Sequence, residues 1–505
     1  MKTSTKILIG VALLIAVVWG VKMIGGSDND NNNDNNHDIF TEVDSVEYRV
    51  MNDEAVVMGI NRASMVVEEV HIRSEIEYNG RMLKVTSINE SAFVDCGEIK
   101  AVYIPNSVTE IGKRAFDGCY SLNSIELPDS LTSINAELFS SCIKLAHVNI
   151  PKGVTSIGDR AFSNCRNLTS ITIPESVTYI ADRAFSLCKG LTSITIPEGV
   201  TSIGEEAFYS SRGLTSIHIP KSVTFIGKGA FSGCSGLSSI TVDPDNPYYN
   251  SQNNCNAIIA TSLNRIIAGC KNTIIPDGVA SIGAAVFLYC KELTSINIPE
   301  SVTSIDTAAF YGCSGLTSID IPDDETTIRF CAFSDCSNLT SITIPEGVTS
   351  IEGYAFSGCS RLTSIHIPEN VTSIENNAFQ GCVNLTSINI PEGVTEISGD
   401  TFSGCKSLTS ITIPASVTNI WGKAFQGCES LSSITIPASV NYIGEDAFSG
   451  CSNLTEMHLR HKKTLPDMGE SDIDTSKVTL YVPTSCGKKY RKDPVFGRFK
   501  NIVEE

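Results

Sequence analysis

The chain has few charged residues, and its charge is mostly negative. Charged side chains make up 18% of the 505 residues, and the formal net charge is -19. That proportion is below the roughly 25% of an average soluble domain. Nucleic acids and anionic lipid surfaces need a basic protein surface for binding. The composition therefore argues against nucleic acid or anionic lipid as the main partner.

Motifs for catalysis and for cofactor binding are missing too. The sequence contains no phosphate-binding loop, no H-E-x-x-H motif and no Ser-His-Asp arrangement. The histidines do not cluster, and the cysteines lack the C-x₂-C spacing of metal sites. We therefore expect a protein that is not an enzyme, with no catalytic residues, no metal site and no cofactor.

What the chain does contain is a repeat. A string such as LTSITIPEGVTSIEGYAFSGC, at residues 339–359, returns every 23 residues. A fixed period between 20 and 50 residues is typical of a solenoid, in which each unit buries its apolar face against its neighbours. The Leu-x-x-Ile-x-Ile spacing predicts a strand with inward-facing side chains, and the following proline ends it. We expect one regular strand per unit, at most a second short one, and little helix.

Most of the 18 cysteines occupy a single position of the repeat, three residues after a phenylalanine. One cysteine per unit at one position predicts a ladder of buried thiols that pack as small apolar side chains. Disulfides along the ladder are geometrically conceivable, because adjacent turns stack about 5 Å apart. Ser211 takes this position in one unit, which shows that a rung can lack its thiol.

The N-terminus predicts export. Lys2 and Lys6 precede a short apolar run at residues 7–21, so residues 1–26 are interpreted as a signal peptide or an uncleaved signal anchor. Residues 27–38 are rich in Asn and Asp and predict a disordered linker. We expect a cell-surface or secreted protein that meets a membrane only through its N-terminal segment.

Three further segments follow the linker. Residues 39–91 contain strand-like runs and predict an N-terminal β cap; residues 92–459 form the repeats, and residues 460–505 a C-terminal cap. The repeats are interrupted at about residues 243–275, where two strand-like runs predict a hairpin insert. If these runs pair, Cys255 and Cys270 lie within reach of a cross-strand disulfide. The alternative is two more buried thiols.

The residue between the two strand isoleucines of each unit should point outward and line the inner face of the solenoid, which is our candidate partner-binding face. These residues are Thr172, Thr195, His218, Asn297, Asp320, Thr343, His366, Asn389, Thr412 and Thr435. They are mostly small and polar, without the Tyr, Trp and Arg anchors of tight interfaces. Broad, weak and multivalent contact fits this face better than one tight pocket.

The repeat string, the segment EYNGRMLKVTSINESAFVDC and the C-terminal segment TLYVPTSCGKKYRKDPVFGRFKNIVEE resemble the BspA-like class of leucine-rich repeats. This class occurs in surface proteins of anaerobic bacteria, spirochaetes and some protists. The resemblance implies a leucine-rich-repeat solenoid, mostly β with short helical or 3-10 turns, forming a curved right-handed superhelix with a cap at each end.

The same resemblance implies a function. It predicts a non-enzymatic scaffold for adhesion and protein–protein interaction, with host matrix proteins or other cells as partners of the repeat surface. Two alternatives stay open, a structural or envelope spacer protein and a carbohydrate-binding surface module. The oligomeric state is not indicated by the sequence.

Overall fold

The computed structural model describes residues 39–51, 53–61, 67–470 and 472–505. The predicted signal segment (1–26) and linker (27–38) lie outside these residues. Residues 40–505 form the unit described below. None of the helices in the described part of the chain is long and apolar enough to cross a membrane.

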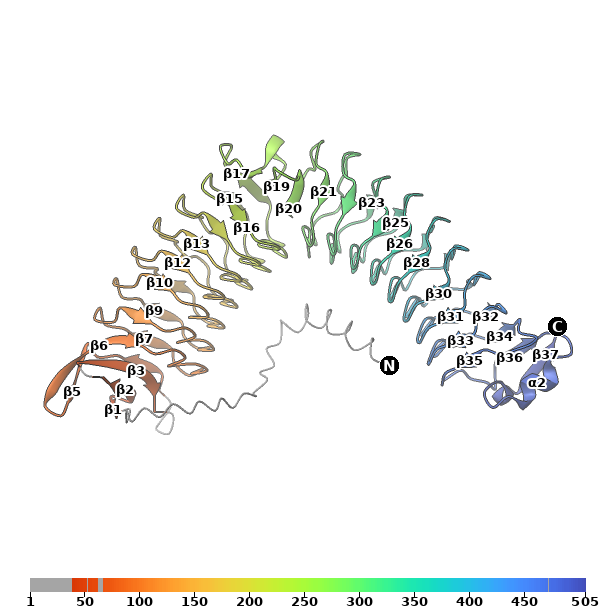
Figure 1. The fold of residues 1–505 in the computed structure, drawn as a ribbon, viewed down its shortest axis with the longest axis horizontal. Coiled ribbons are helices and arrows are strands. Elements are labelled where there is room, and N and C mark those ends of the chain that lie inside the picture. Colours follow the sequence, from red (N-terminus) through yellow and green to blue (C-terminus); the bar gives the residue numbers. More distant parts are fainter. Residues whose placement is uncertain (1–38, 52, 62–66, 471) are drawn as a thin grey trace. The chain divides into compact units, whose positions relative to one another are not determined.

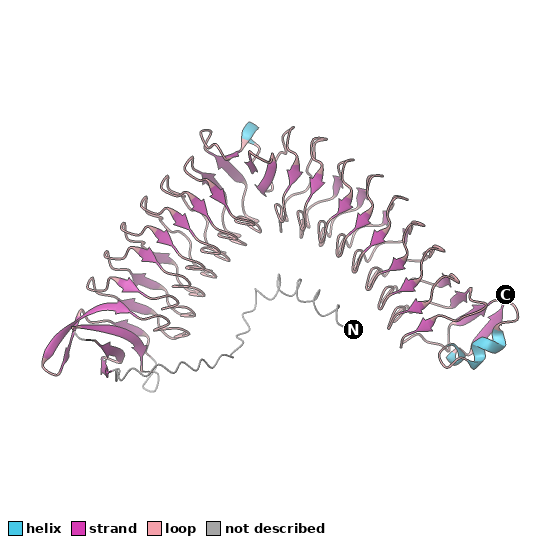
Figure 2. Ribbon diagram, viewed as in Figure 1, coloured by secondary structure: helices cyan, strands magenta, loops and turns pink. Residues whose placement is uncertain are grey.

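The unit is a solenoid built from short parallel strands, as predicted, with very little helix (Figures 1 and 2). Most turns contribute a strand from the Ile-x-Ile segment and a two-residue strand after the following proline. We call the stacked series of these strands the first and the second ladder. Equivalent residues pair across turns: Ile319 faces Ile342 in the first ladder, and Ile328 faces Ile351 in the second.

The first ladder consists of β4 (Glu69–His71), β7 (Ala101–Tyr103), β9 (Ser124–Glu126), β11 (His147–Val148), β15 (Ser216–Ile219), β17 (Ser239–Val242), β23 (Ser318–Asp320), β25 (Ser341–Thr343), β27 (Ser364–Ile365), β29 (Ser387–Ile388), β32 (Ser433–Ile436), β34 (Glu456–Leu459), β36 (Thr479–Val482) and β37 (Asn501–Glu504). The second ladder consists of β8 (Glu110–Ile111), β10 (Ser133–Ile134), β12 (Ser156–Ile157), β13 (Tyr179–Ile180), β14 (Ser202–Ile203), β16 (Phe225–Ile226), β21 (Ser281–Ile282), β22 (Ser304–Ile305), β24 (Thr327–Ile328), β26 (Ser350–Ile351), β28 (Ser373–Ile374), β30 (Glu396–Ile397), β31 (Asn419–Ile420), β33 (Tyr442–Ile443) and β35 (Asp467–Met468).

The repeat phenylalanines form two stacks inside the solenoid, from Phe93 to Phe231 and from Phe287 to Phe448. Phe356 is fully buried, and its ring centroid lies 5.7 Å from that of Phe333 and 5.4 Å from that of Phe379. The rings are nearly parallel, with interplanar angles of 7° and 11°. Each ring within a stack therefore packs against the rings of the preceding and the following turn. This contact couples adjacent turns.

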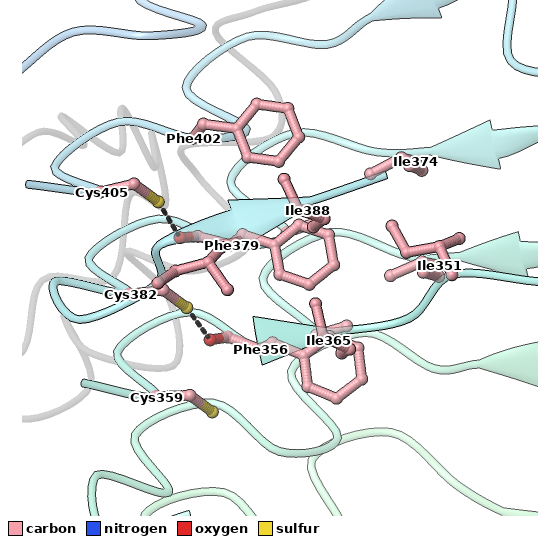
Figure 3. Close-up of a cluster of buried hydrophobic side chains, with 14 of the residues drawn as sticks. Ile351, Phe356, Cys359, Ile365, Ile374, Phe379, Cys382, Ile388, Phe402 and Cys405 are labelled. Carbon is pink, nitrogen blue, oxygen red and sulfur yellow. Dashed lines mark hydrogen bonds between the residues drawn. The ribbon is translucent and has the colours of Figure 1, made fainter. Parts of the chain in front are cut away.

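The repeat cysteines form a second internal ladder, and they do more than pack. The Cys382 thiol donates a hydrogen bond to the backbone carbonyl of Phe356 at 3.2 Å, and Cys405 does the same to Phe379 (Figure 3). All of the cysteines are free thiols. The prediction of buried, unpaired thiols is therefore confirmed, and the hydrogen bond is a function of this position that the repeat pattern did not indicate.

Ser211 shows what the position requires. Its hydroxyl donates to the Phe185 carbonyl at 2.7 Å and accepts a hydrogen bond from the backbone N–H of Cys188 at 3.2 Å. The serine therefore replaces the thiol as a hydrogen-bond donor of similar size. It is the donor, rather than sulfur chemistry, that this position shares between units.

A substitution at Ser211 tests this requirement. Ser211→Ala leaves a buried carbonyl and a buried N–H without these partners, which costs about 1–3 kcal/mol per group in general. We expect a loss of about 2–6 kcal/mol for the two groups together, measured by urea unfolding of the full chain. Ser211→Cys restores the donor used by the neighbouring units and should stay within about 1 kcal/mol of the unaltered chain. Equal stabilities of the alanine and cysteine variants would contradict this role.

The hairpin insert divides the core. It contains β18 (Tyr249–Asn250), η1 (Gln252–Asn254), β19 (Ala257–Ala260) and β20 (Arg265–Gly269). β19 and β20 are antiparallel, and β20 continues in parallel to β21. Ile258 packs in the core on the N-terminal side of the insert, whereas its neighbours Ala257 and Ile259 pack in the core on the C-terminal side. The hairpin is thus a wall between the two cores, with one face buried in each of them.

The predicted disulfide between Cys255 and Cys270 is not formed. Both residues are buried free thiols. Cys255 packs in the C-terminal core and Cys270 in the N-terminal core, on opposite sides of the wall. The prediction placed the two cysteines opposite each other, but Ala257 pairs with Gly269, so Cys270 lies opposite residue 256 rather than 255. Because side chains alternate along a strand, this offset of one residue turns the two thiols to different cores.

A sheet caps the N-terminal end, and short helices cap the C-terminal end. At the N-terminal end β1 (Ile39–Val43), β2 (Val46–Val50), β3 (Glu54–Ile60), β6 (Arg81–Ile88) and β5 (Glu75–Tyr78) lie in this order, and β6 pairs with β8 of the second ladder. At the C-terminal end α2 (Gly487–Lys492) and η2 (Phe496–Arg498) lie beside the last strand, β37. The Glu504 carboxylate accepts hydrogen bonds from the backbone N–H groups of Ser485 and Gly487. Both caps therefore continue the backbone pairing of the ladders.

Candidate interaction surface

The ten residues of the candidate face lie along the first ladder, one per unit. Side chains alternate along a strand, so that Ile319 and Ile321 are buried while Asp320 between them points to solvent. Nine of the ten are exposed, and Asn389 is half-buried. The parallel register places equivalent side chains beside one another, as in the pair His218 and Thr241. The face is therefore a row of side chains about 5 Å apart.

The structure does not bring all ten residues into one row. Thr172, Thr195 and His218 lie on the N-terminal side of the hairpin, and the stretch from Asn297 to Thr435 lies on its C-terminal side. The row is thus interrupted by the insert. A partner that contacts the whole row must span this interruption or bind the two stretches separately.

Most side chains of the row are not used by the scaffold. Within the described part of the chain only two of the ten make side-chain hydrogen bonds. His218 Nδ1 lies 2.9 Å from Thr241 Oγ1, and the Asn389 amide pairs with both backbone groups of Ile367. The neighbouring threonines of the same face differ, because hydroxyls such as that of Thr340 donate to a backbone carbonyl of the preceding turn. The predicted row is the part of this face that remains free for a partner.

One hollow lies on the row. It has a volume of about 410 Å³, and its lining includes Asp320 together with Glu300, Asp323 and Asp324. Glu300 and Asp323 follow the repeat prolines of successive units, so the hollow joins the row to the turn after the first-ladder strands. No basic side chain lines it. Four carboxylates in one hollow repel an anionic ligand.

Burial disfavours the thiolate form of the cysteines inside the solenoid. Burial raises the pKa of Cys188 and of Cys382 to about 12, well above the ordinary value of 9.0. The thiolate is the reactive and metal-binding form of cysteine, and it is scarce at neutral pH under these conditions. The described residues also contain no group of three or more His, Cys, Asp or Glu side chains that could hold a metal ion.

Two aromatic residues that the candidate face did not include stand out on the second ladder. Trp421 directly follows β31 and is 43% exposed, and Tyr442 begins β33. Their ring centroids are 5.6 Å apart. The sequence could have revealed Trp421, because a tryptophan stands there at the position where the adjacent units have Ser398 and Gly444.

Comparisons with known proteins agree with the repeat pattern. The family model described as BspA type leucine rich repeat region (6 copies) matches residues 86–201, 155–269, 264–386 and 372–479. No curated protein matches the chain.

Among solved structures, the chain is similar to two bacterial proteins. A leucine-rich repeat protein from Bacteroides ovatus is 28% identical, with a TM-score of 0.46, over 83% of this chain and 94% of that one. A leucine rich cell surface protein from Faecalibacterium prausnitzii is 28% identical, with a TM-score of 0.45, over 84% of this chain and 96% of that one. At these TM-scores the structural likeness adds nothing to what the repeat match shows.

Proposed function

Since the chain belongs to the BspA-type leucine-rich repeat family, which implies a protein-interaction scaffold, we propose that it is an exported adhesion protein of the cell surface. Its repeat face would bind host matrix proteins or other cells without any chemical reaction. The N-terminal segment would carry the chain to the surface, either as a cleaved signal peptide or as an anchor. The spacer and envelope role stays the alternative.

One observation carries this proposal. Nine of the ten side chains of the row are exposed, and eight of the ten make no side-chain hydrogen bond within the described residues. A surface of many equivalent weak contacts gains avidity when a partner presents repeated epitopes, as fibrous matrix proteins and cell surfaces do. The acidic hollow at Asp320 and the net charge of -19 disfavour nucleic acid and other polyanions.

A solid-phase assay with paired variants tests the proposal. The full chain is applied to immobilised fibronectin, fibrinogen, mucin and partner cells. Replacing Thr172, Thr343 and Thr412 with arginine places bulk and charge on the row and should weaken binding at least tenfold. The control carries the same change at Thr155, Thr178 and Thr349, exposed residues that directly precede strands of the second ladder, and should bind as the unaltered chain does. Equal loss in both variants, or no binding to any of these surfaces, would sink the proposal.

A further inference from the structure

Trp421, which is exposed, and Tyr442, which is half-buried, form an aromatic platform on the second ladder, away from the row described above. The two rings are tilted by 59° with their centroids 5.6 Å apart. At that distance the rings touch each other, so no ligand fits between them. A ligand can only lie on the outer face of the indole, which is 43% exposed.

The solenoid does not need these two aromatic rings. The position of Trp421 holds Ser398 in the preceding unit and Gly444 in the following one, and the position of Tyr442 holds Ser373 and Ser350 in earlier units. The backbone N–H of Trp421 bonds to the Ile397 carbonyl whatever the side chain is. A large apolar side chain exposed where a serine or glycine completes the fold indicates a binding role.

The platform is held in place and surrounded by polar groups. The indole Nε1–H of Trp421 donates to Glu396 Oε2 at 2.8 Å, which fixes the plane of the ring. Register places Glu396, Asn419, Tyr442 and Asp467 side by side on successive strands of the second ladder. These four side chains offer two carboxylates that accept hydrogen bonds, and an amide and a phenol that can each donate and accept them. An ordered aromatic plane loses little entropy when a ligand binds.

We propose that this platform binds a pyranose ring of a glycan. One face of a pyranose presents C–H groups, which are attracted to the electron-rich face of an indole, while its hydroxyls need donors and acceptors around the rim. The platform supplies both. A cationic ligand would use the indole and the carboxylates, but it has no use for the amide and phenol donors of Asn419 and Tyr442. The mixed rim therefore favours a sugar.

This glycan site goes beyond the proposed protein-binding role and lies on a different ladder. It does not depend on the row from Thr172 to Thr435, so either site can fail without the other. A chain with both sites would bind the protein part and the sugar part of a glycosylated surface at the same time.

Trp421 also provides the readout, because the chain has only two tryptophans, Trp19 and Trp421. In the full chain carrying Trp19→Phe, the emission reports Trp421 alone. The protein is screened against printed β-glucan, chitin, mannan, galactan and mucin-type oligosaccharides, and the strongest binder is titrated in solution. We expect a shift or quenching of the emission that saturates, and in the chain that retains both tryptophans we expect Trp421→Ser to weaken array binding at least tenfold.

Three controls separate the outcomes. Phe225→Ser removes an exposed aromatic side chain of the same ladder that is 55% exposed, and it should leave glycan binding unchanged. Circular dichroism should show that Trp421→Ser folds as the unaltered chain does, because the preceding unit already has a serine, Ser398, at this position. Binding to immobilised matrix proteins should persist in Trp421→Ser. The site is refuted if no oligosaccharide binds, if Trp421→Ser binds as well as the unaltered chain, or if the emission responds to a trimethyllysine peptide but to no sugar.

Discussion

Above pH 9 the solenoid is expected to lose stability steeply. Burial raises the pKa of Cys188, Cys234 and Cys382 to about 12, from an ordinary value of 9.0. The folded state therefore keeps protons that the unfolded chain releases. Each such thiol contributes stability that is fully present below pH 9 and is lost as the pH rises towards 12. The loss is about 1.4 kcal/mol per pH unit for each thiol in this window.

Several thiols acting together make this effect large. A typical domain is stable by only about 5–15 kcal/mol, so a ladder of buried thiols can exhaust that margin within about one or two pH units above 9. The measurement is urea unfolding under reducing conditions at intervals from pH 7 to 11. Tyrosines titrate in the same range, and Cys188→Ser isolates the thiol contribution because a serine already holds the next rung at Ser211. The variant should show a shallower pH dependence than the unaltered chain, and identical slopes would contradict the role of the thiols.

Replacing Phe356 with alanine is expected to destabilise the middle of the solenoid by about 3–5 kcal/mol. The ring is fully buried and stacks on Phe333 and Phe379, so its removal opens a cavity and deprives both neighbours of contacts. In a solenoid each unit contacts only its neighbours. The loss should therefore concentrate in the units around residue 356 rather than spread evenly along the chain.

Hydrogen exchange resolves this localisation. Amides of β25, β26, β27 and β28 should exchange faster in Phe356→Ala, whereas amides of β12 and β13 should keep their protection. Phe225→Ala is the matched control, because that phenylalanine is 55% exposed and outside the stack; it should change stability by less than about 0.5 kcal/mol. A uniform rise in exchange along the chain would contradict the nearest-neighbour description.

The repeat made the fold predictable from the sequence. A period of 23 residues with Ile-x-Ile at a fixed place determines which side chains are buried, and Ile342, Ile344 and Phe356 are buried as expected. The outward position of Thr343 follows from the same alternation. Periodicity gives the register of every unit at once, because equivalent residues must pair when identical turns stack.

The repeat could not predict positions where a unit departs from it. Glu325 stands where the neighbouring units have Val302 and Val348, and it is buried with its carboxylate accepting a hydrogen bond from the Ile305 N–H at 2.6 Å. There the second ladder is interrupted between β22 and β24. Burial raises the pKa of this carboxyl group. Neither the burial nor the interruption follows from the repeat, because both depend on how the local backbone accommodates a carboxylate.

The predicted disulfide in the hairpin insert was not formed for a related reason. The strands of the insert could be recognised by composition, but which faces they bury depends on the two cores they separate. Trp421 was overlooked on similar grounds, since averaging over units hides a residue that occurs in only one of them. The informative positions for function are therefore the exceptions to the repeat, whereas the repeat itself informs the fold.

The wall formed by β19 and β20 has a consequence for how the molecule opens. The stack of phenylalanines runs from Phe93 to Phe231 and begins again at Phe287, so direct ring contact does not cross the insert. Contact across it depends on the hairpin and on bonds such as that from Ser232 Oγ to the Ala285 carbonyl. Cooperativity in a linear array is limited by its weakest junction. We therefore expect the two halves of the array to unfold in separate steps, so that one half can still hold a partner after the other has melted.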